Sequence, residues 1–213
     1  DNIQGANFRS LAPTTSSIRY FPLLSSVLAG NLTQQDPDTS STWETLSNVP
    51  RELNFALTVR DNAIGGGGVS SELVKVTVVD NDGAFSITSQ RDGQLYLAGS
   101  SQSITWNVAG TNVAPILAEQ VNITMSADGG LTFPYVLAEN VSNDGSHNVT
   151  IPNVVSATAR VRVEPTNNIF YSINTRNFGV TRDDIVLTYS ELNYPVCNNE
   201  SVSASLTYET STA

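Results

Sequence analysis

Acidic and amide side chains that could hold a metal ion follow two apolar runs of the sequence. They occur as Arg60-Asp61-Asn62 and as Asp80-Asn81-Asp82. Carboxylate and amide oxygens are the hard ligands that calcium prefers in proteins. Asp61, Asp80 and Asp82 are therefore candidate calcium ligands, and a solvated linker without metal is the alternative.

A second polar motif reads Ser126-Ala-Asp128-Gly-Gly130-Leu-Thr132-Phe133 and matches the Asp-box pattern S-x-D-x-G-x-T-[W/F] at every position. Its aspartate is expected to accept hydrogen bonds from N–H groups of the turn, and Gly130 to supply a positive φ. Phe133 is expected to cover the hairpin from the core side. The motif predicts a structural turn, with ligand contact as the alternative.

Residues for nucleophilic or zinc chemistry are scarce. The chain contains one histidine, His147, and one cysteine, Cys197, whereas a zinc site needs three or four nitrogen, sulfur or carboxylate ligands. Neither an H-E-x-x-H nor a G-x-S-x-G motif is present, so we expect no catalytic residue in this chain. Cys197 is interpreted either as half of a disulfide with a partner further along a longer protein or as an inert thiol.

Composition excludes further classes. The 213 residues include 20 acidic and 10 basic side chains, which gives a net charge of −10. Phosphate repels such a surface, so nucleic-acid binding is not expected. No run of 18 apolar residues occurs, so no membrane span is predicted. Charged residues make up only 14%, which disfavours an all-helical fold.

Residues 1–82 predict only part of a β domain. Apolar and polar residues alternate in two segments, 52–60 and 71–79, and four glycines at 65–68 lie in the loop that joins them. This pattern predicts an antiparallel hairpin with one buried face. Two strands cannot enclose a core, so we expect the earlier strands to lie upstream in a longer protein. A small domain with long ordered loops is the alternative.

Residues 83–180 predict a complete β-sandwich, because short alternating strands follow one another at regular intervals. Three sets of apolar residues each share a face: Ile104, Trp106 and Val108; Val121, Ile123 and Met125; Ala159, Val161 and Val163. Arg160 and Arg162 are then expected to point into solvent. The predicted strands are 85–89, 94–98, 103–108, 120–126, 133–138, 147–151, 157–164 and 169–173.

Residues 181–213 contain two more strand patterns, at 185–189 and 202–208. They predict a linker and the start of a further β domain. The fold class expected for the whole chain is therefore all-β, with tandem antiparallel sandwiches of immunoglobulin or fibronectin type III character and an incomplete first domain.

Three long phrases resemble one protein family. They begin at Leu11-Ala-Pro-Thr-Thr, at Leu53-Asn-Phe-Ala-Leu-Thr-Val-Arg-Asp-Asn and at Ile104-Thr-Trp-Asn-Val, and together they extend over about residues 8–180. They are similar to the region that follows the catalytic domain in secreted, reprolysin-like zinc metallopeptidases of Bacteroidetes. The run at Asp80 also resembles the linkers of cadherin-like repeats, where calcium stiffens the joint. A cysteine often found in the family is replaced here by Ala118.

The resemblance implies a cadherin- or PKD-like domain followed by an immunoglobulin- or fibronectin-like one. It implies an extracellular or cell-surface location. The implied partners are the catalytic and C-terminal domains of the parent protein, and any zinc would lie in the catalytic domain. The expected role is spacing, stabilising or substrate docking, without catalysis. The alternative is an adhesin-like or carbohydrate-binding module, which would expose aromatic side chains on one sheet face; the candidates are Tyr20, Phe21, Trp43, Tyr96, Tyr135 and Tyr171.

Overall fold

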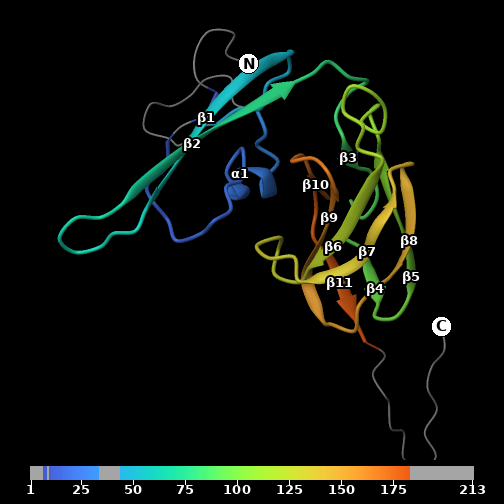
Figure 1. Cartoon of the computed structure of the whole chain (residues 1–213). Helices are drawn as coiled ribbons and strands as arrows, with labels where there is room; N and C mark the ends of the chain where they lie inside the picture. Colours follow the sequence, from blue (N-terminus) through green and yellow to red (C-terminus); the bar gives the residue numbers. More distant parts are fainter. Residues whose placement is uncertain (1–6, 9, 34–43, 183–213) are drawn as a thin grey trace, which may run out of the picture.

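The computed structural model describes residues 7–8, 10–33 and 44–182 and has an all-β architecture, as the sequence predicts. Two bodies are visible in Figure 1: a β-sandwich and a long hairpin that projects beside it. A short N-terminal segment lies between them. The strands predicted at 185–189 and 202–208, and Cys197 with them, lie outside the described residues.

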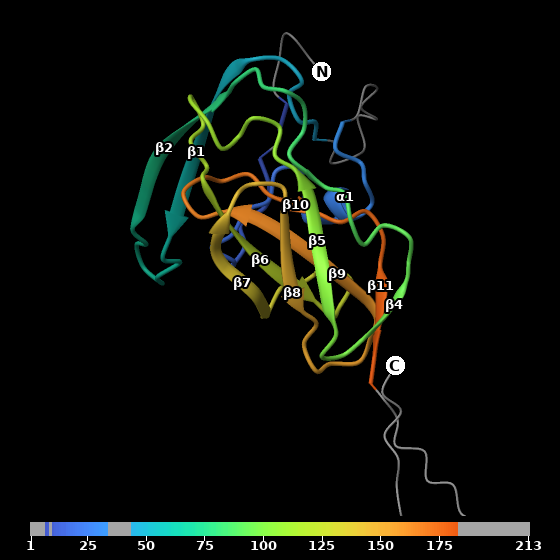
Figure 2. The same cartoon turned by 90° about the vertical axis from the view of Figure 1, so that its right-hand side faces the viewer.

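Two sheets form the sandwich, and Figure 2 shows one in front of the other. The larger sheet has the strand order β4-β11-β9-β6-β7, with β10 paired to β9, and the smaller has the order β3-β5-β8. The strands of the larger sheet are β4 (Leu95–Leu97), β6 (Gln120–Ser126), β7 (Tyr135–Ser142), β9 (Ser156–Pro165), β10 (Ser172–Ile173) and β11 (Phe178–Thr181). Those of the smaller are β3 (Ser86–Ile87), β5 (Ser101–Asn107) and β8 (Ser146–Thr150).

The core lies between these two sheets and includes the apolar faces that the alternation predicts for β5, β6 and β9. Ile104 and Trp106 enter it from β5, and the three alternate apolar residues of β6 and of β9 enter it from the opposite sheet. All six of those residues have no exposed surface: Val121, Ile123, Met125, Ala159, Val161 and Val163. Burial of such side chains contributes roughly 1.5–3 kcal/mol each to folding, so this double layer accounts for much of the sandwich's stability.

One strand of the sandwich differs from the prediction. β11 was not predicted, because Phe178 and Val180 alternate with a single glycine over only four residues. Phe178 and Val180 are nevertheless buried in the core. β11 pairs antiparallel with β9 but parallel with β4, so the expectation of purely antiparallel pairing is wrong at this edge. There β4 and β11, the first and last strands of the larger sheet in chain order, run in the same direction.

The hairpin consists of β1 (Arg51–Arg60) and β2 (Val69–Val78), which pair along their whole length. Leu53, Phe55, Leu57 and Val59 share one face with Val74 and Val76 of the partner strand, because directly opposite residues of an antiparallel pair lie on the same side. Within the described part of the chain, β1 and β2 form a sheet of two strands only. The prediction that further strands complete this domain stays a prediction.

The N-terminal segment, defined as residues 10–33, contains the helix α1 (Leu24–Leu28). It supplies contacts to both bodies. Phe21 lies against Phe55 of the hairpin at a centroid distance of 4.6 Å, and Tyr20 lies edge-on to Tyr171 of the sandwich at 5.6 Å. This segment therefore joins the hairpin to the outer face of the larger sheet.

Candidate functional site

The Asp-box motif forms a closed polar turn between β6 and β7. The Asp128 carboxylate accepts hydrogen bonds at 3.0 Å from the N–H groups of Leu131 and Thr132, and from the hydroxyls of Ser126 and Thr132 at 2.6 Å. The Ser126 hydroxyl accepts in turn from Gly130 N–H at 2.8 Å. All of these carboxylate partners lie within four residues, so the turn holds its own shape.

Hydrogen bonding also sets the charge of this turn. Desolvation raises the pKa of Asp128, but the hydrogen bonds from Ser126 and Thr132 outweigh it and lower the pKa to about 2. The carboxylate is therefore ionised throughout the physiological pH range. Because its oxygens are already occupied by donors of the turn, Asp128 is better suited to a structural role than to ligand contact.

The last residue of the motif lies elsewhere than predicted. Phe133 is outside the buried core cluster and lies beneath Arg162, whose guanidinium carbon is 4.6 Å from the ring centroid. The expectation that Arg162 points into solvent is also wrong, because only 16% of its side chain is exposed. The Tyr171 hydroxyl is buried nearby without a hydrogen-bond partner, and desolvation raises its pKa to about 12. The outer face of β9 is thus covered rather than wet.

The Asp-box turn also contacts the N-terminal segment. Gly130 has a φ of +95°, and a Cβ placed on it would lie 2.5 Å from Leu28 Cδ2 of α1. The positive φ favours glycine at this position, and a Cβ there would also require the Leu28 side chain to shift. The turn therefore contacts the last residue of α1, a contact that the sequence motif did not predict.

The three predicted calcium ligands do not come together. Asp61 follows β1 at the loop end of the hairpin, whereas Asp80 follows β2 at its opposite end. Ten residues of strand separate the two ends by roughly 30 Å. Within the described residues no group of three acidic, histidine or cysteine side chains could hold a metal ion, so calcium at the junction remains a prediction for Asp80 and Asp82 alone.

Each of the two polar runs instead forms hydrogen bonds to the backbone of the chain. Asp61 accepts hydrogen bonds at 3.0 Å from the N–H groups of Ala63 and Gly68, which lower its pKa and close the glycine-rich loop. Asn81 donates to the Ala109 carbonyl at 3.0 Å and ties the linker to the sandwich. These contacts explain the polar residues as turn and linker elements.

The aromatic side chains proposed as a carbohydrate platform are not exposed together. Phe21 lies against Phe55, Tyr96 against Phe178, and Tyr20 against Tyr171, while Tyr135 packs on the core. Trp43 lies outside the described residues. The large hydrophobic side chains that are exposed in the described ranges are all aliphatic, so no stacking surface for sugar rings is formed there.

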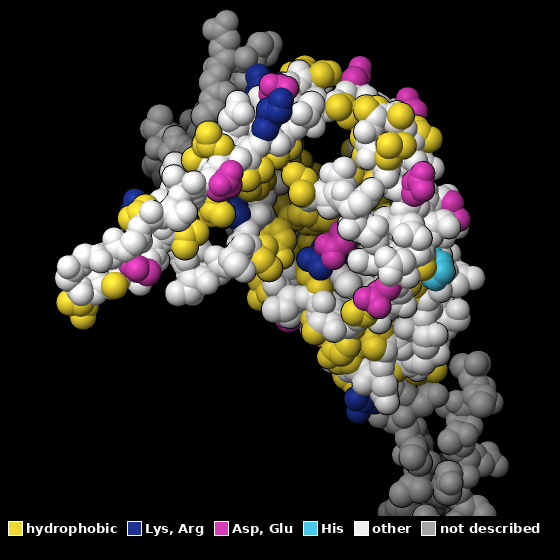
Figure 3. All heavy atoms as spheres, in the orientation of Figure 1, with side chains coloured by type: hydrophobic (Ala, Val, Ile, Leu, Met, Phe, Trp, Pro, Cys, Tyr) yellow, Lys and Arg dark blue, Asp and Glu magenta, His cyan; other side chains and the backbone are white. Residues whose placement is uncertain are grey.

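The hairpin exposes apolar side chains on the face that also carries Phe55. Leu57 and Val59 continue this face beyond Phe55, and Val74 lies opposite Phe55; each of the three is about half exposed, and Ile64 at the loop is fully exposed. Figure 3 shows hydrophobic atoms along the projecting arm and in the hollow beside it. A contiguous exposed apolar face on a fixed arm is typical of an interaction site. Alternation alone cannot reveal it, because alternation predicts a buried face.

Three buried polar residues that sequence reasoning missed hold the loops in place. Asn143 accepts from the Trp106 indole N–H at 2.8 Å and donates to the Ala118 carbonyl at 2.8 Å. Asn174 accepts from Val161 N–H and donates to the Gln90 carbonyl, both at 2.7 Å. Glu44 forms an ion pair with Arg19 and accepts from Leu23 N–H. Because asparagine is frequent throughout this chain, no sequence signal marks Asn143 or Asn174 as buried.

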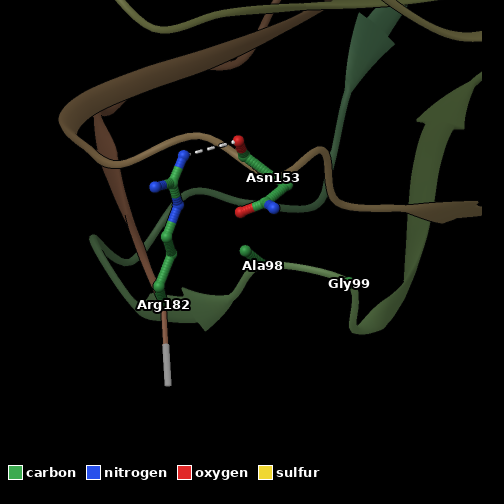
Figure 4. Close-up of a pocket in the computed structure, with 4 residues that line it drawn as sticks. All are labelled: Ala98, Gly99, Asn153 and Arg182. Atoms are coloured by element: carbon green, nitrogen blue, oxygen red, sulfur yellow. Dashed lines mark hydrogen bonds between the residues drawn. The ribbon is translucent and has the colours of Figure 1, made fainter. Parts of the chain in front are cut away.

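A small open pocket of about 330 Å³ lies at the far end of the sandwich, lined by Ala98, Gly99, Asn153 and Arg182 (Figure 4). Arg182 donates to the Asn153 carbonyl at 3.0 Å. One guanidinium without an acid, base or nucleophile among the lining residues offers no catalytic arrangement. His147 lies on β8 opposite Ile104, in a ladder position rather than in this pocket.

No known protein-family model and no curated protein matches the sequence. In the described part of the chain, no helix has the length and apolarity that a membrane crossing requires.

Proposed function

We propose that this chain is a non-catalytic accessory region of a secreted bacterial zinc metallopeptidase, in which the hairpin docks a neighbouring domain or a protein substrate. One observation supports this above the others. The apolar face formed by Leu57, Val59 and Val74 is half exposed, yet its base packs on Phe21 of the N-terminal segment, whose neighbouring Tyr20 contacts Tyr171 of the sandwich. A hairpin supported in this way presents its apolar surface in a preorganised orientation, which reduces the entropic cost of binding a partner.

The protease attribution itself comes from the phrases that begin at Leu11, Leu53 and Ile104. The coding sequence upstream of Asp1 tests it directly. A signal peptide and an H-E-x-x-H-x-x-G-x-x-H motif support the attribution. If only further β repeats are encoded, the chain is an adhesin-like surface rod, which would use the same apolar face on an extracellular protein.

The docking role is tested with two neighbouring substitutions on β1. Leu57→Glu places a charge on the apolar face, whereas Thr58→Glu places the same charge on the opposite, polar face of the same strand. The immobilised chain is probed with the purified catalytic domain of the parent protein. We expect Leu57→Glu to abolish capture and Thr58→Glu to leave it unchanged. Equal capture by both variants contradicts the role, as does chelator-sensitive casein cleavage by the unmodified chain alone.

A further inference from the structure

One edge of the hairpin is open to pairing with another strand. Asp61 N–H donates to the Gly68 carbonyl at 3.3 Å across the hairpin. Backbone groups of successive residues point to opposite edges of a strand, so the odd-numbered residues of β1 bond to β2. Those that direct their N–H and C=O groups outward are exposed: Glu52, Asn54, Ala56, Thr58 and Arg60. Within the described residues, β1 pairs with β2 alone.

The two edges of the hairpin differ in how they are protected. By the same alternation, the outer edge of β2 carries Lys75 among its outward residues, and a lysine on an edge discourages strand addition. β1 contains neither lysine nor proline. Of the two edges, the β1 edge is therefore the one that admits a further strand.

We propose that β1 pairs antiparallel with β1 of a second copy of this chain, about a two-fold axis at Ala56, to give a continuous four-stranded sheet. In this register Glu52 lies opposite Arg60 of the second copy. Leu53 lies opposite Val59, and Phe55 opposite Leu57. Outward-facing residues meet outward-facing residues, as ladder hydrogen bonding requires. The apolar faces of both hairpins become one surface.

The charge pattern selects this register over its neighbours. With the axis at Phe55, Arg51 would lie opposite Val59 and Glu52 opposite Thr58. With the axis at Leu57, Asp61 would lie opposite Leu53. Of these three registers, only the Ala56 axis places opposite charges opposite each other and keeps apolar residues opposite apolar ones, with Asn54 opposite Thr58. Such cross-strand pairs stabilise sheets, whereas like charges destabilise them. The net charge of −10 opposes association, so the test uses physiological salt, which screens distant charges. The proposal does not depend on the protease attribution.

Charge reversal on β1 tests the pairing. Glu52→Arg and Arg60→Glu each place like charges opposite one another in a homodimer, twice by symmetry, and should weaken self-association about tenfold or more. A mixture of the two variants restores both opposite-charge pairs and should dimerise. Light scattering then gives twice the 22.7 kDa of one chain. Structural damage in either variant cannot produce a restored heterodimer, so failure of the mixture to associate overturns the proposal.

A symmetric cross-link tests the axis. In a Cys197→Ser background, Ala56→Cys places two thiols opposite each other at a Cα separation of about 5.5 Å, within disulfide range. Oxidised glutathione should convert them to an intermolecular disulfide and be reduced to glutathione. Leu73→Cys, at the same level on β2, is the matched control and should remain uncross-linked. A monomer at all concentrations, or equal cross-linking of both variants, contradicts the β1 edge.

Discussion

Ile123 and Leu57 both lie on the apolar face of an antiparallel strand pair, in sequences with the same alternating pattern. Ile123 of β6 has no exposed surface, whereas 59% of Leu57 of β1 is exposed. The difference comes from what lies opposite: a second sheet covers β6, whereas among the described residues the rings that pack on Phe55 at the base of the hairpin are those of Phe8 and Phe21. Alternation thus specifies which side is apolar, and the number of layers decides whether that side is buried.

Truncation of these two residues should separate the two regions most strongly. Ile123→Ala leaves a cavity in the closed core and is expected to lower the free energy of unfolding by about 2–5 kcal/mol. Leu57→Ala removes surface already in contact with water and should cost about 0.5 kcal/mol or less. Urea unfolding followed by fluorescence measures both. Similar losses would mean that the hairpin face is covered in solution.

Removal of the Asn143 side chain should have the next largest effect, because it leaves the Trp106 indole N–H and the Ala118 carbonyl buried without a partner. Asn143→Ala is expected to cost about 2–3 kcal/mol. Asn148→Ala, on an exposed position of β8, is the matched control and should be near neutral. An equally small effect of both changes in chemical denaturation would show that the Asn143 contacts do not matter to stability.

These two comparisons also show what the sequence could reveal. Alternation was sufficient for the core of β5, β6 and β9, because each of these strands has one fully covered face. It could not reveal Asn143 or Asn174, whose roles come from loops that meet only in three dimensions. It placed Arg162 in solvent, because nothing in β9 indicates that the Phe133 ring lies against the Arg162 side chain. The Asp-box turn was predictable, since all of its partners are local.

Substitution of two adjacent glycines tests the contact between the N-terminal segment and the sandwich. Gly129 and Gly130 both have positive φ, but only at Gly130 would a Cβ meet α1. Either substitution by alanine should cost about 1 kcal/mol of backbone strain. Gly130→Ala should in addition displace Leu28 and increase proteolysis within the N-terminal segment. If both variants are cleaved at the same rate, the contact between Gly130 and Leu28 does not stabilise the N-terminal segment.

The last expected effect depends on pH. The pKa of Asp128 is about 2 in the folded chain, below its ordinary value of 3.8, so its stabilisation is complete above pH 3.8 and is lost as the pH falls through 2. Because the carboxylate is largely exposed, Asp128→Asn should cost only about 1 kcal/mol near neutral pH. This difference should shrink as the pH falls toward 2 and vanish below it. A difference that is constant between pH 6 and pH 2 would exclude the ionised carboxylate as its source.

Native-state hydrogen exchange of the dilute, monomeric chain tests the contrast between the two regions most directly. Leu57 and Ile123 each have an amide within a strand, so their protection compares an open hairpin with a closed core. We expect Ile123 to exchange only on global unfolding and Leu57 to exchange by local opening at least about a hundredfold faster. Equal protection of the two amides would contradict this difference, because the hairpin would then be as fully supported as the sandwich.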